Sequence, residues 1–220
     1  MKKGDYTKLA KTWLENSSKF ELDGLALKGM KIDRVELGYI RCYFVIPDHL
    51  SDANANWNAG AMSVLIDDMA AGAVFSITRG NLATVDFTMS FYSTVKVNEE
   101  VEIEASVVGE KGNLVSVVID IKKKGSGEKD ANANRNAGAM SVLIDDMAAG
   151  AVFSITRGNL ATVDFTMSFY STVKVNEEVE IEASVVGEKG NLVSVVIDIK
   201  KKGSGEKVVV GKQWMHANSP

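Results

Sequence analysis

The chain has 220 residues, of which 45% are hydrophobic and 25% are charged, a balance typical of globular proteins and sufficient for one large domain or two small ones. A formal net charge of −4 without a basic stripe excludes a typical nucleic-acid-binding surface. The single cysteine, Cys42, excludes an intrachain disulfide and favours a reducing compartment. We therefore expect a cytoplasmic protein, with a mitochondrial or peroxisomal location as alternatives, and no secretory signal in residues 1–20.

Two elements are predicted in the first fifty residues. Apolar side chains at helical spacing predict an amphipathic helix from Tyr6 to Asn16. A run rich in Val, Ile, Tyr and Phe predicts a long strand from Lys31 to Ile46, which ends at Pro47. Asp and Asn alternate with Ala over residues 52–56, a composition typical of a loop that supplies helix caps.

At residue 52 a repeated segment begins, because residues 52–129 and 130–207 are the same sequence written twice. Of the 78 aligned positions 77 are identical, and the one difference is Trp57 against Arg135. Solenoid repeats diverge from one another and need several units to bury a core. The pair therefore indicates either a very recent duplication or an error in the gene model.

Each copy opens with a long apolar helix, at about 58–77 in the first and 136–155 in the second. Because this helix is apolar on all sides, we expect protein around it on every side. Asp67 and Asp68 lie in its middle, and each would cost about 3 kcal/mol inside a bilayer. The sequence therefore predicts a buried core helix and no membrane span.

Three strands follow the helix, at 84–92, 100–107 and 114–121 in the first copy, and a last strand, 207–214, follows only the second copy. Apolar and polar residues alternate along each strand, as in an antiparallel sheet with one covered face. We predict an α+β fold in which an antiparallel sheet wraps around a central apolar helix. The repeat divides it into residues 1–129, a half without its last strand, and residues 130–220, a half without its first strand.

The residues available for catalysis are few, because the repeated segment contains neither histidine nor cysteine. A Cys–His nucleophile is excluded, and a Ser–His–Asp triad or a zinc site is not expected. A carboxylate on an apolar helix is either satisfied by neighbouring polar groups or tuned by burial as a general base. Asp67 and Asp68 point about 100° apart, so only one of them can face a given cleft.

The start of the same helix is a second candidate. Asn58, Ala59 and Gly60 offer backbone N–H groups at the positive end of the helix dipole, where a developing oxyanion could bind. Asp67 lies roughly 13 Å further along the helix, too far to act on the same carbonyl. A complete site would need the helix start of one unit and the aspartate of another, which predicts a homo-oligomer or an intrachain pseudo-dimer.

These residues resemble a known family. The run from Asn56 to Asp68 resembles the helix-start motif of hotdog-fold thioesterases, above all the acyl-coenzyme A thioesterase 13-like group, and Ala83–Phe87 resembles that group's next strand. The resemblance implies hydrolysis of fatty acyl-CoA to free acid and CoA, a role in fatty acyl metabolism, and no metal or other cofactor. It also implies a sheet in the order first, third, fourth, fifth, second strand, with dimers joined through their second strands.

The family motif is His-Gly-Gly with an aspartate nine residues after the histidine, and this spacing selects Asp67 and Asp145 as general base or nucleophile. The resemblance places substrate and oxyanion contacts at Asn58, Ala59, Gly60 and Thr84, and in the second copy at Asn136, Ala137, Gly138 and Thr162. Asparagine stands at the histidine position, and alanine replaces the first glycine. A non-catalytic protein that binds acyl-CoA or an acyl chain is therefore the alternative function.

Overall fold

A computed structural model describes residues 3–17, 19, 21–78, 83–124, 129–134, 138–156, 160–174 and 176–217. The first half contains α1 (Lys3–Ser17), α2 (Glu21–Leu27), β1 (Lys31–Glu36), β2 (Tyr39–Val45), a 3-10 turn (Asp48–Leu50), α3 (Ala59–Thr78), β3 (Asp86–Phe91), β4 (Glu100–Lys111) and β5 (Leu114–Lys123). The rest contains β6 (Lys129–Asn134), α4 (Gly138–Thr156), β7 (Leu160–Phe169), β8 (Val179–Lys189), β9 (Leu192–Lys201) and β10 (Lys207–Ala217).

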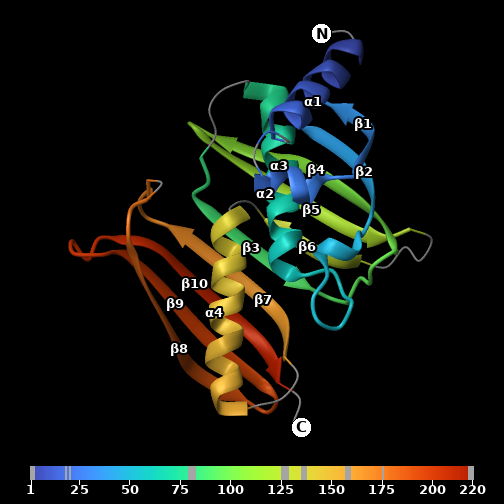
Figure 1. Cartoon of the computed structure of the whole chain (residues 1–220). Helices are drawn as coiled ribbons and strands as arrows, with labels where there is room; N and C mark the ends of the chain where they lie inside the picture. The colour runs from blue at the N-terminus through green and yellow to red at the C-terminus, as the bar shows by residue number, and fades with distance from the viewer. Residues whose placement is uncertain are drawn as a thin grey trace.

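The ten strands of the described residues form one antiparallel sheet in the order β1-β2-β4-β5-β6-β3-β7-β10-β9-β8. The sheet curves around α3 in one half and around α4 in the other, so the predicted α+β architecture is confirmed (Figure 1). The two halves meet where β3 pairs with β7. The family order of third, fourth, fifth and second strand is β4-β5-β6-β3 in the first half and β8-β9-β10-β7 in the second. The junction therefore joins the two second strands, β3 and β7.

Helix α3 is the centre of the first core. Val64, Leu65 and Ile66 are at most 1% exposed, as are Met69 and Ala70 one turn later. Strands β2, β4 and β5 lie on one side of α3, and α1 and α2 cover its other side (Figure 1). By length and composition α3 is apolar enough to cross a membrane, and two thirds of its most apolar stretch, 67%, is buried inside the protein.

The predicted strand over 31–46 is wrong as a single element, because the chain turns back at Leu37 and Gly38 to form the β1–β2 hairpin. Gly38 has φ +70°, a left-handed conformation that suits glycine, and its amide donates to Ser76 Oγ at 2.7 Å. Strand β2 pairs with β4, so this segment completes the first copy. Its Tyr43 hydroxyl donates to Glu102 on β4 at 2.9 Å.

The interior strand missing from the first copy is replaced by β6, which spans the boundary between the copies. It inserts between β5 and β3, where it satisfies the backbone groups of both neighbours. The same Asp-Ala-Asn-Ala-Asn sequence is a turn at residues 52–56, closed by Asp52 Oδ1, which accepts from the amides of Asn54 and Asn56 at 2.8 and 2.9 Å. The division of the chain at residues 129 and 130 stays a prediction, since β6 crosses it.

Helix α4 has the sequence of α3 but a different environment. Ile144, Ala148 and Val152 face the sheet and are fully buried. On the opposite side Leu143 is 38% exposed and Phe153 is 56% exposed. The expectation of protein on every side is therefore wrong for α4, because within the described residues α1 and α2 cover only α3.

Candidate active site

A cleft at the junction of the halves brings together the start of α3 and the middle of α4. It is lined by Ala59, Gly60 and Ser63 of α3, Met89 and Phe91 of β3, Asp145 of α4, and Thr162 and Phe165 of β7. Four of the predicted site residues, Ala59, Gly60, Asp145 and Thr162, therefore meet in one place. The helix start comes from the first copy and the aspartate from the second, which is the arrangement that the helix geometry requires.

The start of α3 presents amide groups to this cleft. Asn58 caps the helix, because its Oδ1 accepts from the Ala61 amide at 3.0 Å and its backbone carbonyl accepts from Met62 at 2.9 Å. The amides of Ala59 and Gly60 precede these and have no acceptor within the helix. Asparagine at the family's histidine position therefore keeps the helix end intact and leaves two N–H groups to bind an anion.

Asp145 is held by two donors on one of its carboxylate oxygens. Thr162 Oγ1 on β7 donates to Asp145 Oδ1 at 2.8 Å, and Gln213 Nε2 on β10 donates to the same oxygen at 2.6 Å. Gln213 Nε2 also lies 2.8 Å from Thr162 Oγ1, so the three side chains form a closed triangle. Because both donors are directed at Oδ1, Asp145 Oδ2 is the oxygen that can take a proton from a bound water.

The electrostatics of Asp145 fit a general base. Burial raises the pKa of Asp145 above its usual value, and hydrogen bonds from Thr162 and Gln213 oppose that rise. The negative charge of neighbouring Asp146 also raises the pKa of Asp145 slightly. A carboxylate with a raised pKa is a stronger base than a free aspartate, yet its two donors keep the ionised form accessible.

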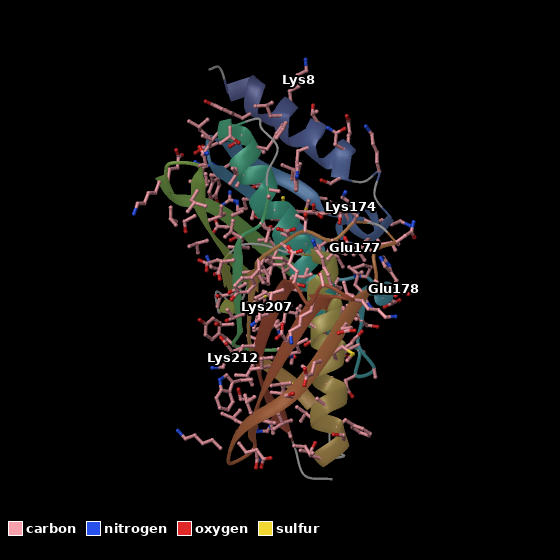
Figure 2. All side chains as sticks on the ribbon, turned by 90° about the vertical axis from the view of Figure 1, so that its left-hand side faces the viewer. Lys8, Lys174, Glu177, Glu178, Lys207 and Lys212 are labelled. Carbon is pink, nitrogen blue, oxygen red and sulfur yellow. The ribbon has the colours of Figure 1, made fainter. Side chains whose placement is uncertain are left out.

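Gln213 was missed in the sequence analysis, because it lies outside the repeated segment and outside the family motif. It is fully buried, and its Oε1 has no hydrogen-bond partner among the described residues. Lys212, one residue earlier, projects from the side of the sheet away from α4 (Figure 2). The signal in the sequence is a polar residue at an apolar position. Gln213 lies on the same face of β10 as Gly211 and Met215, which are both buried.

In the other half the contact between the corresponding threonine and aspartate is longer. Thr84 Oγ1 donates to Asp67 Oδ1 at 3.4 Å, compared with 2.8 Å in the second copy. Gly138 begins α4, and the predicted Asn136 and Ala137 lie outside the described residues. Strand β6 ends at Asn134, which pairs with Thr88 and Val118. In the second copy Lys212 pairs with the counterparts of these two residues, so Lys212 occupies the position of Asn134. The described part of β6 thus stops one residue before the position of Gln213.

Asp68 points to another part of the molecule, as its angular separation from Asp67 requires. It faces α1 and α2, and burial, together with the nearby charges of Asp23 and Asp67, raises the pKa of Asp68 to about 8. A hydrogen bond from Ser17 opposes this rise. Its counterpart Asp146 is exposed. Neither Asp68 nor Asp146 lines the cleft, and among the described residues no cluster of acidic, histidine or cysteine side chains could hold a metal ion.

Comparison with known families decides the relationship. The sequence pattern of the thioesterase superfamily matches residues 54–129 and again residues 134–208, which together make up more than half of the chain. The chain belongs to the thioesterase superfamily. No curated protein sequence matches the chain. The two matched segments correspond closely to the two copies, so the superfamily domain is present twice.

Solved structures of thioesterases share the hotdog fold. The 12:0-ACP thioesterase of Umbellularia californica is similar with a TM-score of 0.67 at 8% identity, over 82% of this chain and 95% of that one. An acyl-CoA thioesterase II from Mycobacterium marinum gives a TM-score of 0.62 at 11% identity, over 86% and 96%. Thioesterase superfamily member 2 of Mus musculus gives 0.51 at 17% identity, over 57% of this chain and 92% of that one. At these identities the likeness establishes the fold.

Proposed function

We propose that this thioesterase superfamily protein hydrolyses fatty acyl-CoA to free acid and CoA in the cleft between its halves. The observation that carries the proposal is the meeting of Asp145, with its two hydrogen-bond donors, and the free amides at the start of α3. Thioester hydrolysis needs a base for water and a donor for the oxyanion, and these groups supply one each. The choice of acyl-CoA rests on the motif resemblance, since similar structures include both acyl-CoA and acyl-ACP thioesterases.

The mechanism follows from the placement of these groups. Asp145 Oδ2 takes a proton from a water molecule, and that water attacks the thioester carbonyl. The amides of Ala59 and Gly60 hold the oxyanion of the tetrahedral intermediate, which collapses with breakage of the C–S bond and loss of CoA thiolate. The proton that Asp145 has taken returns to the departing thiolate. Thr162 and Gln213 fix the carboxylate throughout, so that the same oxygen faces the water.

We further propose that one of the two copies does most of the catalysis. Asp145 lines the cleft that holds the start of α3, and Thr162 donates to it at 2.8 Å, whereas Thr84 lies 3.4 Å from Asp67.

The matched pair Asp145→Asn and Asp67→Asn tests both proposals. Thiol release from long-chain acyl-CoA is followed with a chromogenic reagent, and circular dichroism checks that each variant is folded. Asp145→Asn should lower kcat by about 10²- to 10⁴-fold, the usual loss of a general base, while Asp67→Asn should keep most of the activity. Equal losses would contradict the single-site proposal. Acyl-CoA binding by the unmodified protein without thiol release would instead identify a binding protein, and release from acyl-ACP alone would correct the substrate.

A further inference from the structure

Strand β8 forms one margin of the described sheet, and its free edge is independent of the proposed function (Figure 1). It has the sequence of β4, because residues 179–189 repeat residues 101–111. Strand β4 pairs with both β2 and β5, whereas within the described sheet β8 pairs with β9 alone. One row of β8 backbone N–H and C=O groups is therefore available to a further strand.

The inner face of β8 is less well covered than that of β4. Ile103 and Ala105 of β4 are fully buried, and β2 contributes Phe44 to the same core. The counterparts on β8, Ile181 and Ala183, are only partly buried. A strand that paired with β8 would gain hydrophobic stabilisation by covering these two side chains.

Strand β2 shows what kind of segment pairs with this sequence. Its inner residues are apolar, and its outer residues contact the glutamates of β4. The Tyr39 hydroxyl donates to Glu104, and Arg41 Nη1 lies 3.9 Å from the same carboxylate. The Tyr43 hydroxyl donates to Glu102 at 2.9 Å. The edge therefore accepts a strand in which apolar residues alternate with tyrosine and arginine.

The corresponding glutamates of β8, Glu180 and Glu182, are exposed. The lysine that pairs with Glu104 in the first half corresponds to Lys200, which pairs with Asp198 on its own strand at 3.1 Å. Two exposed carboxylates beside an open edge favour a strand with cationic or hydroxyl side chains. Two β8 edges paired with each other would instead place glutamates opposite glutamates, which disfavours a second copy as the occupant.

The loop before β8 keeps the conformation that its counterpart has in the first half. The Lys96 amide donates to Glu99 Oε2 at 2.7 Å, and the Lys174 amide donates to Glu177 Oε2 at 2.9 Å. The asparagine before each glutamate has a positive φ, 66° in the first half and 69° in the second. The loop is therefore preorganised in the same way in both halves.

In the first half this loop holds the chain that follows β2. The Ile46 amide donates to the Glu99 carbonyl at 3.0 Å, and the Asn98 amide donates to the Ile46 carbonyl at 2.8 Å. Further on, the Trp57 amide donates to the Val95 carbonyl at 2.6 Å. The same loop thus binds both ends of the stretch between β2 and α3.

In the second half a hollow of about 430 Å³ lies at this place. It is lined by Thr172, Lys174, Asn176, Glu177 and Lys201. The hollow has a direct cause, because the copy of the covering Asp-Ala-Asn-Ala-Asn sequence is part of β6 and lies in the middle of the sheet. The free edge and the hollow adjoin each other, since Lys201 pairs with Val179 at the start of β8.

We propose that β8 and the hollow beside it form a docking site for an extended segment of a partner protein in which apolar residues alternate with tyrosine or arginine. The segment adds a strand to the margin of the sheet by backbone hydrogen bonds. Its tyrosine or arginine side chains bind Glu180 and Glu182, and its apolar side chains cover the inner face of β8. Its end continues into the hollow, as residues 46–57 cover the loop of the first half.

A peptide with the sequence of residues 38–57 and Cys42→Ser is the probe, because it carries both parts of the segment that covers β4. A labelled peptide titrated with the full chain should show saturable binding by fluorescence anisotropy. A shorter peptide of residues 38–46 should bind more weakly, since it cannot reach the hollow. A peptide whose two tyrosines and arginine of the β2 sequence are replaced by glutamate should not bind.

Variants of the full chain locate the bound peptide. Glu182→Lys should weaken binding at least about tenfold, because it removes charge-assisted contacts and repels the arginine. Glu188→Lys is the matched control and should leave binding unchanged: it is exposed on the same strand, and its counterpart on β4 lies beyond the stretch that pairs with β2.

A cross-link tests the register. Glu180→Cys should form a disulfide with a peptide that carries Tyr43→Cys, since Tyr43 lies opposite the corresponding glutamate of β4, whereas Glu188→Cys should not. The native Cys42 is buried and does not compete. Absence of saturable binding up to about 1 mM peptide would overturn the proposal. So would binding that Glu182→Lys leaves unchanged, or self-association of the chain that Glu182→Lys alters, because these would assign the peptide to another surface or the edge to a second copy.

Discussion

Replacing Gln213 by leucine isolates the contribution of a buried donor to Asp145 that lies outside the repeat. Leucine has a similar volume and fits a buried position, but it removes the Nε2 donor that lies 2.6 Å from Asp145 Oδ1 and 2.8 Å from Thr162 Oγ1. A hydrogen bond to a charged group is worth about 1.5–3 kcal/mol, so losing this bond removes about that much stabilisation from the ionised carboxylate. The pKa of Asp145 should therefore rise in Gln213→Leu, because the bond from Gln213 opposes the effect of burial.

The direction of the pH effect follows from the role of the carboxylate. Asp145 works as a base only when ionised, so the acidic limb of the kcat/KM profile should move to higher pH. At pH values well above the new pKa the variant should recover much of its activity, since the carboxylate is then fully ionised. A purely structural effect would lower activity at all pH values and leave the limb in place.

The assay is thiol release from acyl-CoA across the pH range, with kcat and KM fitted separately. Lys212→Leu is the control, because Lys212 is the neighbouring residue on the exposed side of β10 and should not move the acidic limb. An unchanged acidic limb in a folded Gln213→Leu protein would refute the argument, because it would show that Gln213 does not stabilise the ionised carboxylate.

Two further predictions use the repeat as its own control. Burial and the charges of Asp23 and Asp67 raise the pKa of Asp68 to about 8. Between about pH 4 and 8 the folded state therefore keeps a proton on Asp68 that the unfolded state releases. Thermal stability should fall as the pH rises from about 4 to 8. Asp68→Asn should remove much of this fall, measured as Tm against pH. Asp146→Asn, at the exposed counterpart, should leave the fall in place. Identical profiles for the two variants would contradict the raised pKa of Asp68. Gly72→Ala should cost about 1–3 kcal/mol by crowding Trp13 and Ile40, whereas Gly150→Ala should be neutral or stabilise by up to about 1 kcal/mol, as read from urea unfolding at low protein concentration. Equal effects at the two glycines would show that α1 does not press on Gly72 in solution.

Hydrophobic periodicity was enough to predict the core helix and the three strands of each copy, because a buried face imposes its period directly on the sequence. Helix geometry also separated Asp67 from the helix start, and so predicted a site shared between two halves. The family spacing singled out Asp145, which the structure places in the cleft. These inferences depend on spacing along a single element, which a sequence records faithfully.

The features that the sequence analysis missed depend on neighbours that are distant in the chain. Residues 52–56 and 130–134 are identical, yet one segment is a turn and the other a strand, because only the second lies beside an unpaired β5 and β3. Local sequence cannot encode that difference. In the same way α3 and α4 differ in exposure because, within the described residues, α1 and α2 cover α3 and not α4. Gln213 became visible as a site residue only when β10 was placed next to β7.

The junction of β3 with β7 also limits how far such a chain can grow. Each copy of the segment brings a single second strand, and in the described sheet both second strands are consumed in joining the two halves. A third tandem copy would meet only β1 and β8 at the sheet margins, neither of which is a second strand. Duplication here is therefore self-terminating: one additional copy closes a pair, whereas an open array of the solenoid kind has no edge on which to continue.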